Sequence, residues 1–209
     1  LGDVLETAHR MGINTMNDGL SAYGLSLALG TAEASLLDMT YAYSVFDNNG
    51  VMVGTPVPPF NARDGYRQLN PVSVLRIETA EGEVLWEYGQ DKGTFDRRPV
   101  LESGIAYMIT DILSDTDARI PAFPRGNVLE LSRPAAVKTG TSDDFRDSWT
   151  IGYTPQYTVG IWVGNNDNTS MTDVTGIVGA APIWNAIMEY IHVSDGLPVE
   201  EWTVPPTIV

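Results

Sequence analysis

The segment from Arg133 to Asn166 constrains the fold more than any other part of this sequence. It contains three short runs rich in strand-forming residues, which are Ala135–Thr141, Ser148–Tyr153 and Tyr157–Gly164. The break at Thr154–Gln156 is short, and its central Pro155 presets a turn backbone and cannot donate to a strand ladder. We therefore expect the last two runs to pair as an antiparallel hairpin.

The first run ends in Lys138, Thr139, Gly140 and Thr141, which place one cation, two hydroxyls and a residue without a side chain in succession. An ammonium about 4 Å from a carboxylate contributes roughly 4 kcal/mol at an effective dielectric constant of about 20. Each threonine can donate a hydrogen bond to the same anion. Gly140 would let another backbone lie along the strand and pair with it. The pattern therefore predicts an anion-binding strand.

A second interpretation of the same residues assigns them no ligand. Lys138 would then be an edge-strand charge that discourages aggregation, and Gly140 would mark a β-bulge. A nucleotide phosphate loop is excluded, because Val137 rather than glycine precedes the lysine.

Length and composition fit one globular domain or a piece of one. A chain of 209 residues with 43% hydrophobic and 19% charged residues can remove roughly 70% of its unfolded surface from water. The formal charge of −15 repels phosphate backbones, so we expect no nucleic-acid partner. The chain has no cysteine, and His9 and His192 lie near opposite ends. We therefore expect no metal and no cofactor, and no apolar run is long enough for a membrane segment.

Periodicity and capping residues predict four helices. The first runs from Asp3, its expected cap, to Met11; the second begins at Thr31 and stops at the Asp47–Gly50 turn. The other two are expected at 100–113 and 181–192.

The remaining segments are expected to be irregular or peripheral. Ser21–Gly30 is interpreted as a buried connection or short strand, and Val51–Pro71 as a loop. A peripheral hairpin is expected within 71–90. The chain would form one domain part over 1–195, followed by an extended, proline-containing tail or linker at 196–209.

Several motifs together resemble the transpeptidase domain of class A, bifunctional penicillin-binding proteins. Lys138–Thr141 is followed at the appropriate spacing by Asp147–Trp149, Gly152–Pro155 and Trp162–Asn165, and Gly24–Gly30 also matches. The resemblance covers nearly the whole chain. It implies an α/β (α+β) fold in which an antiparallel sheet carries flanking helices, as in penicillin-binding enzymes and serine β-lactamases. It also implies a membrane-anchored parent protein at the extracytoplasmic face of the bacterial cell membrane.

The resemblance implies a role for each residue of the K-T-G-T sequence in peptidoglycan cross-linking through a serine acyl-enzyme. Lys138 would be a catalytic residue that supplies positive potential near the serine. Thr139 and Thr141 would bind the terminal carboxylate of a stem peptide or a β-lactam. The N–H of Thr141 would also donate to the oxyanion, and Gly140 would let the substrate backbone approach.

Two of the three motifs of these enzymes, S-x-x-K and S-x-N, are absent. The only lysines are Lys92 and Lys138, and the positions three residues before them hold Gly89 and Ala135. We therefore expect the chain to be the C-terminal portion of the domain, incomplete and inactive alone, with an exposed apolar face where the missing serine helix would pack.

Two other functions are considered for the same residues. A non-catalytic module could bind a peptide carboxylate at the strand edge. A serine β-lactamase-like hydrolase would carry a similar strand, but the proline-containing tail and the Trp162–Asn165 pattern favour the synthases.

Overall fold

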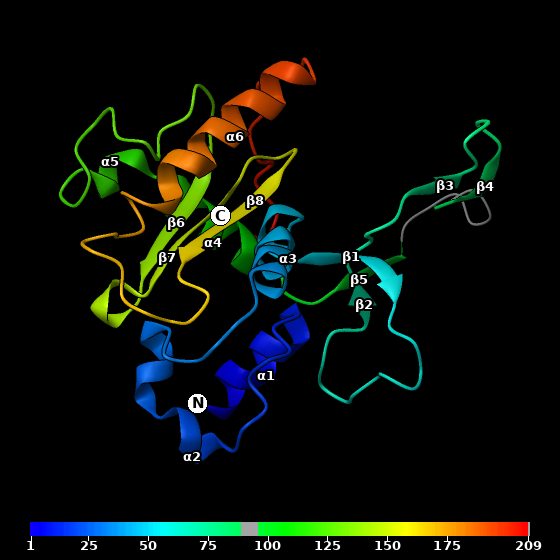
Figure 1. Cartoon of the computed structure of the whole chain (residues 1–209), viewed down its shortest axis with the longest axis horizontal. Helices are drawn as coiled ribbons and strands as arrows, with labels where there is room; N and C mark the ends of the chain where they lie inside the picture. Colours follow the sequence, from blue (N-terminus) through cyan, green and yellow to red (C-terminus); the bar gives the residue numbers. More distant parts are fainter. Residues whose placement is uncertain (89–95, 209) are drawn as a thin grey trace.

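A computed structural model describes residues 1–88 and 96–208, and its central sheet is built from the three predicted runs (Figure 1). The strands are β6 (Ala136–Thr141), β7 (Asp147–Tyr153) and β8 (Thr158–Gly164), in the order β6-β7-β8 and antiparallel throughout. The N–H of Thr154 donates to the carbonyl oxygen of Tyr157 at 3.0 Å and closes the β7–β8 turn. The predicted strands and hairpin are confirmed.

Helices cover both faces of this sheet. Helix α6 (Ala180–Ser194) packs the fully buried Trp184 against Val137 on one face. Helices α3 (Leu36–Asp47) and α4 (Ser103–Ser114) lie on the other face, where the hydroxyls of Thr110 and Tyr153 are 3.0 Å apart. Because side chains alternate along a strand, the face of Val137 is opposite to that of Lys138.

Helix α1 (Gly2–Met11) ends as predicted, at a left-handed Gly12 with φ of 114°. The expected cap was wrong: Leu1 precedes the helix, and Asp3 lies inside its first turn, where a carboxylate stabilises the positive end of the helix dipole.

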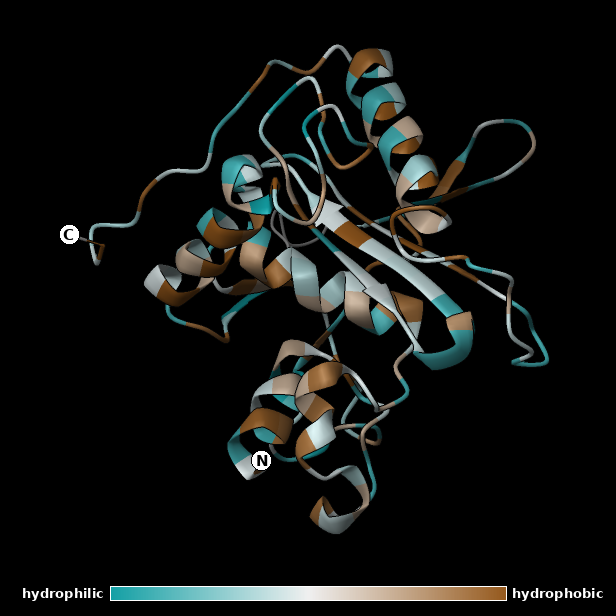
Figure 2. Ribbon diagram, turned by 90° about the vertical axis from the view of Figure 1, so that its left-hand side faces the viewer, coloured by the Kyte–Doolittle hydropathy of each residue, from teal (hydrophilic) through white to brown (hydrophobic). Residues whose placement is uncertain are grey.

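The prediction for Ser21–Gly30 was also wrong. This segment forms helix α2 (Leu20–Tyr23) and the 3₁₀ helix η1 (Leu25–Leu29), and only Leu27 of it is buried. Leu25 and Leu29 are 90% and 88% exposed. Figure 2 shows hydrophobic positions recurring along the helices at the N-terminal end. Most apolar residues of this segment therefore lie at the surface, and only Leu27 contributes to the core.

Helix α3 begins at Leu36, after Ser35, and the predicted start at Thr31 was wrong. The hydroxyl of Ser35 accepts the backbone N–H of Asp38 at 3.1 Å, which satisfies a donor that has no partner inside the helix. The predicted stop at the Asp47–Gly50 turn is confirmed.

The segment expected to be a loop after Gly50 contains strand β1 (Val51–Pro56), which pairs with β2 (Leu69–Asn70) and β5 (Asp96–Pro99). The loop prediction was therefore wrong at both ends. Val51, Met52 and Val53 favour a strand, and Pro56 stands at its last position, where proline is tolerated.

The predicted hairpin is present as β3 (Arg76–Glu78) and β4 (Val84–Glu87). Figure 1 shows it extending away from the central sheet, and its strand residues are exposed apart from a half-buried Glu87. Positions 89 and 90 of the predicted hairpin range lie outside the described residues.

Helix α4 exposes an apolar stripe. Ala106 and Thr110 are buried towards the sheet, whereas Ile105, Met108 and Ile112 are 43%, 49% and 66% exposed. Their spacing of three and four residues places them on one face of the helix. The outer face of α4 is therefore an exposed apolar surface.

Two short helices complete the regular structure. Helix α5 (Thr116–Arg119) is capped by Asp115, whose carboxylate accepts the N–H of Ala118 at 2.8 Å. The 3₁₀ turn η2 (Asp143–Phe145) connects β6 to β7. Among the described residues, no helix combines the length and apolar character needed to cross a bilayer.

The C-terminal segment 196–208 runs extended along the molecule and contacts it at several points. The indole N–H of Trp202 donates to Asp47 at 3.2 Å, and its ring meets Tyr153 edge-on at 5.7 Å. Arg133 donates to the carbonyl oxygen of Pro198 at 3.1 Å. These contacts attach the tail to the same body that carries the sheet.

Candidate functional site

The K-T-G-T residues occupy strand β6, whose outer edge has no partner strand within 1–88 and 96–208. The N–H of Ser142, just beyond the strand, donates inward to Asp147 at 3.1 Å. Backbone groups alternate in direction along an antiparallel strand, so the N–H and C=O groups of Thr139 and Thr141 point to the open edge. This edge can therefore accept an extended backbone.

Lys138 is exposed on the same side of the sheet as α4. Its ammonium donates to the carbonyl oxygen of Thr139 at 2.7 Å, which brings the charge to the open edge. Within the described residues Lys138 makes no ion pair. The positive charge is thus available to an anion that arrives at β6.

The hydroxyl of Thr141 is oriented by a neighbouring backbone group. Its Oγ1 accepts the N–H of Gly176 at 2.9 Å. A threonine hydroxyl has one proton and two acceptor lone pairs. Because Gly176 occupies an acceptor position, the proton of Thr141 remains free to be donated to a ligand.

The segment 175–179 that supplies this contact is fixed to the sheet by side chains of β7. Ser148 donates to the carbonyl oxygen of Thr175 at 2.9 Å and accepts the N–H of Ala180 at 3.0 Å. Thr150 donates to the carbonyl oxygen of Gly176 at 3.2 Å. These buried hydroxyls hold the connection to α6 against the candidate site.

Sequence reasoning missed the contribution of Gly176. A Cβ at this position would lie 2.7 Å from the carbonyl oxygen of Gly140, 2.8 Å from that of Trp149 and 3.0 Å from the Cβ of Thr139. Only glycine fits that approach without a shift of the backbone. The position follows a polar loop with no periodic pattern, so nothing in the sequence linked it to a strand 35 residues away.

The other residues of the matched pattern support the strands. The indole N–H of Trp162 donates to Asp147 at 2.8 Å, which joins β8 to the start of β7. Arg146, the residue just before this part of the pattern, pairs with Asp144 at 3.5 Å. Tyr153 is fully buried against α4, and this burial raises the pKa of its phenol.

Both histidines have structural contacts. The ring of His192 is buried and hydrogen-bonds the hydroxyl of Thr154 at 2.8 Å and the carbonyl oxygen of Met188 at 2.7 Å. His9 stacks on Tyr66 with 4.0 Å between ring centroids.

Comparison with known proteins finds penicillin-binding proteins among the relatives of this chain. No protein-family model matches it. It is 32% identical over 205 residues to penicillin-binding protein 1A of Aquifex aeolicus, an alignment that covers 97% of this chain and 24% of the relative. It is 31% identical over 167 residues to penicillin-binding protein 1C of Escherichia coli, covering 80% of this chain and 17% of the relative.

The chain is a homologue of the class A penicillin-binding proteins. It matches their transpeptidase portion and spans about a quarter of the length of the Aquifex aeolicus relative.

Solved structures show the same fold. The crystal structure of penicillin-binding protein 1A from Haemophilus influenzae superimposes with a TM-score of 0.63 at 21% identity, covering 88% of this chain and 30% of that one. Penicillin-binding protein A from M. tuberculosis, as its imipenem acyl-enzyme complex, gives 0.58 at 18% identity, covering 90% and 42%. The chain thus has the predicted fold of the penicillin-binding proteins, an antiparallel sheet with flanking helices.

Proposed function

We propose that this chain is part of a peptidoglycan D,D-transpeptidase and contributes the substrate-binding strand of its acylation centre. The observation that carries the proposal is the open edge of β6. The ammonium of Lys138 and the outward-pointing N–H groups of Thr139 and Thr141 lie together at this edge. The homology to penicillin-binding proteins supports a penicillin-binding, transpeptidase-type activity.

The substrate would bind as an added strand along the open edge of β6. A stem peptide ending in D-alanyl-D-alanine would lie antiparallel to β6, and Gly140 would keep that approach free of a side chain. The terminal carboxylate would accept hydrogen bonds from the hydroxyls of Thr139 and Thr141. Lys138 would leave the carbonyl oxygen of Thr139 and place its charge near the reacting groups.

The chemical step would be acyl transfer to a serine from an S-x-x-K motif outside these 209 residues. The serine oxygen would attack the penultimate D-alanyl carbonyl, and the outward N–H of Thr141 would donate to the oxyanion. The C–N bond would break and release the terminal D-alanine. An amine of a second stem peptide would then attack the ester and form the cross-link, freeing the serine.

The segment with the serine would need an apolar surface on the Lys138 side of the sheet. The stripe of Ile105, Met108 and Ile112 on α4 lies on that side. We propose that it packs against the serine helix. The complete protein would be membrane-anchored and act outside the cytoplasmic membrane of a bacterium, where peptidoglycan is cross-linked.

Fluorescent penicillin tests the proposal. The protein is prepared as this chain and as a longer chain that continues upstream in its gene through the S-x-x-K serine. We expect covalent labelling of the longer chain alone. Lys138→Ala should slow that labelling by about 10²- to 10³-fold, the range seen when one electrostatic group is removed from such centres. Lys92→Ala, at the other lysine of the sequence, should leave the rate unchanged.

Two outcomes would contradict the proposal. One is covalent labelling of the 209-residue chain. The other is reversible binding of the peptide carboxylate by this chain, abolished by Lys138→Ala, together with no acylation of the longer one; that result would support a binding module.

A further inference from the structure

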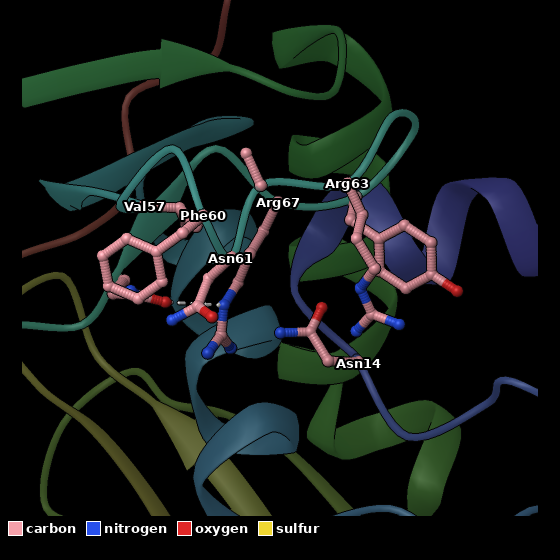
Figure 3. Close-up of a pocket in the computed structure, with 9 residues that line it drawn as sticks. Asn14, Val57, Phe60, Asn61, Arg63 and Arg67 are labelled. Atoms are coloured by element: carbon pink, nitrogen blue, oxygen red, sulfur yellow. Dashed lines mark hydrogen bonds between the residues drawn. The ribbon is translucent and has the colours of Figure 1, made fainter.

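A polar pocket lies between the connection from α1 to α2 and the connection from β1 to β2 (Figure 3). Its volume is about 460 Å³. It is lined by Asn14, Val57, Phe60, Asn61, Ala62, Arg63, Tyr66, Arg67 and Asn70. These residues are separate from β6, so the pocket is independent of the site proposed above.

Arg67 is held rigidly at the pocket by three acceptors. Its Nη1 donates to Asp38 at 2.6 Å and to the carbonyl oxygen of Gly12 at 3.0 Å, and its Nε donates to Asn70 at 3.2 Å. The Arg67 and Asp38 side chains are only 13% and 11% exposed. The remaining nitrogen, Nη2, has no hydrogen-bond partner among the described residues, so its donors are available to a ligand.

Arg63 is positioned on the opposite wall. Its guanidinium lies 4.0 Å from the ring centroid of Tyr66. Asn17 accepts from Nη1 of Arg63 and from the hydroxyl of Tyr66, each at 2.9 Å. Arg63 has no carboxylate partner in the part of the chain that the structure describes. A cation fixed in this way loses little conformational freedom when an anion binds.

The side chain of Asn14 lies between the two arginines. Figure 3 shows its amide nitrogen directed towards the Arg67 guanidinium, so donors face donors with no acceptor between them. The Oδ1 of Asn14 is buried without a hydrogen-bond partner. An unpaired oxygen calls for a donor, which a carboxylate lacks, so the part of the Asn14 side chain that is available to an anion is its amide nitrogen.

The charges at the pocket favour a monoanion. Asp38 balances the charge of Arg67, which leaves one net positive charge from Arg63. None of the lining residues is acidic, in a chain whose formal charge is −15. Planar guanidinium groups bind planar carboxylates with paired hydrogen bonds, whereas a phosphate dianion would exceed the charge available.

We propose that this pocket is a binding site for a carboxylate-bearing ligand, held by the guanidinium groups of Arg63 and Arg67 and by the amide nitrogen of Asn14. The exposed ring of Phe60 at the rim offers an apolar contact for the rest of the ligand. The carboxylate could belong to a free small molecule or to the end of a peptide, since both present the same group.

The experiment uses the ¹⁵N-labelled chain and follows the side-chain N–H signals of Arg63, Arg67 and Asn14 by NMR. The probes are N-acetylalanine, its neutral amide, and inorganic phosphate. We expect saturable shifts with N-acetylalanine and none with the amide. A tripeptide with a free C-terminus, compared with N-acetylalanine, distinguishes a peptide end from a small molecule by which binds more tightly.

Arg63→Gln should weaken binding of N-acetylalanine by about tenfold or more, as expected for the loss of a charge-assisted hydrogen bond. Arg125→Gln is the matched control, because Arg125 is also exposed but pairs with Asp117 away from the pocket. Equal shifts with acid and amide, tighter binding of phosphate, or unchanged binding in Arg63→Gln would each overturn the proposal.

Discussion

The ammonium of Lys138 donates a hydrogen bond to the carbonyl oxygen of Thr139 at 2.7 Å. That oxygen belongs to the open edge of β6, so the lysine occupies the position that the backbone of an incoming strand would use. The contact is local, exposed and replaceable by water. The lysine therefore contributes charge to the site without supporting the fold.

Lys138→Met should change the free energy of unfolding by less than about 0.5 kcal/mol, because surface substitutions away from special features have small effects. Urea unfolding measures this change. A loss above about 1 kcal/mol would contradict the account. Aggregation of the variant, tested by sedimentation at matched concentration, would instead support the interpretation of Lys138 as a protective edge charge.

Gly176→Ala should disturb the candidate site through the 175–179 segment, which packs against β6. The new methyl group would lie 2.7 Å from the carbonyl oxygen of Gly140, so either the 175–179 segment or β6 must move. We expect a loss of about 1–3 kcal/mol in unfolding free energy, as for other overpacked sites.

The matched control for this substitution is Gly19→Ala. Gly19 has an ordinary φ of −62° and nothing within 4 Å of an added Cβ. Because Gly19 is the N-cap of the short helix α2, where alanine is a poorer cap, the loss of unfolding free energy should stay at or below about 1 kcal/mol, less than that of Gly176→Ala. Equal effects of the two substitutions would show that Gly176 is not packed against β6.

Asp47 should make stability depend on pH. Burial raises the pKa of its carboxyl from 3.8 to about 6, although Trp202 and Thr158 donate hydrogen bonds that oppose the shift. The folded state therefore binds the proton more tightly than the unfolded chain. The stabilisation from this group is complete below pH 3.8 and is lost as the pH rises through about 6.

Asp47→Asn removes this dependence. Its unfolding free energy at pH 7.5 should exceed that of the unmodified chain by about 1–3 kcal/mol, since each pKa unit corresponds to about 1.4 kcal/mol. Urea unfolding at pH 4.5 and 7.5 measures the difference. Asp64→Asn, at an exposed aspartate, is the control; the same pH dependence in both variants would contradict the prediction.

Trp202→Ala tests whether the C-terminal segment stabilises the body. The indole contacts Asp47 and meets the ring of Tyr153 at 5.7 Å, so its loss should cost about 1–3 kcal/mol. Trp86→Ala on the peripheral hairpin should cost clearly less, because Trp86 is 42% exposed. If both substitutions had the same effect, the tail would be a linker that does not contribute to folding.

The sequence predicted the elements whose signals are local. The β7–β8 hairpin followed from alternation and from Pro155, and the end of α1 followed from Gly12. The start of α3 was misplaced because Thr31 and Ser35 are both plausible caps, and only the structure shows that Ser35 bonds the N–H of Asp38. Propensity alone could not choose between them.

Long-range contacts were not predictable in the same way. All four residues of the candidate site are consecutive on β6, so the motif itself placed them together. Gly176, by contrast, reaches Thr141 only through the packing of the loop before α6. Arg63, Arg67 and Asn14 likewise meet only after the β1–β2 connection folds over the end of α1.

The most direct test of the central claim is amide hydrogen exchange along β6 in the free chain. The account predicts that the N–H of Thr141, which points to the open edge, has a protection factor at least about a hundredfold lower than that of Gly140, which pairs with β7; this ratio corresponds to about 2.7 kcal/mol. Equal, strong protection of both amides would mean that the edge is already occupied, and would contradict its role as the substrate-binding strand.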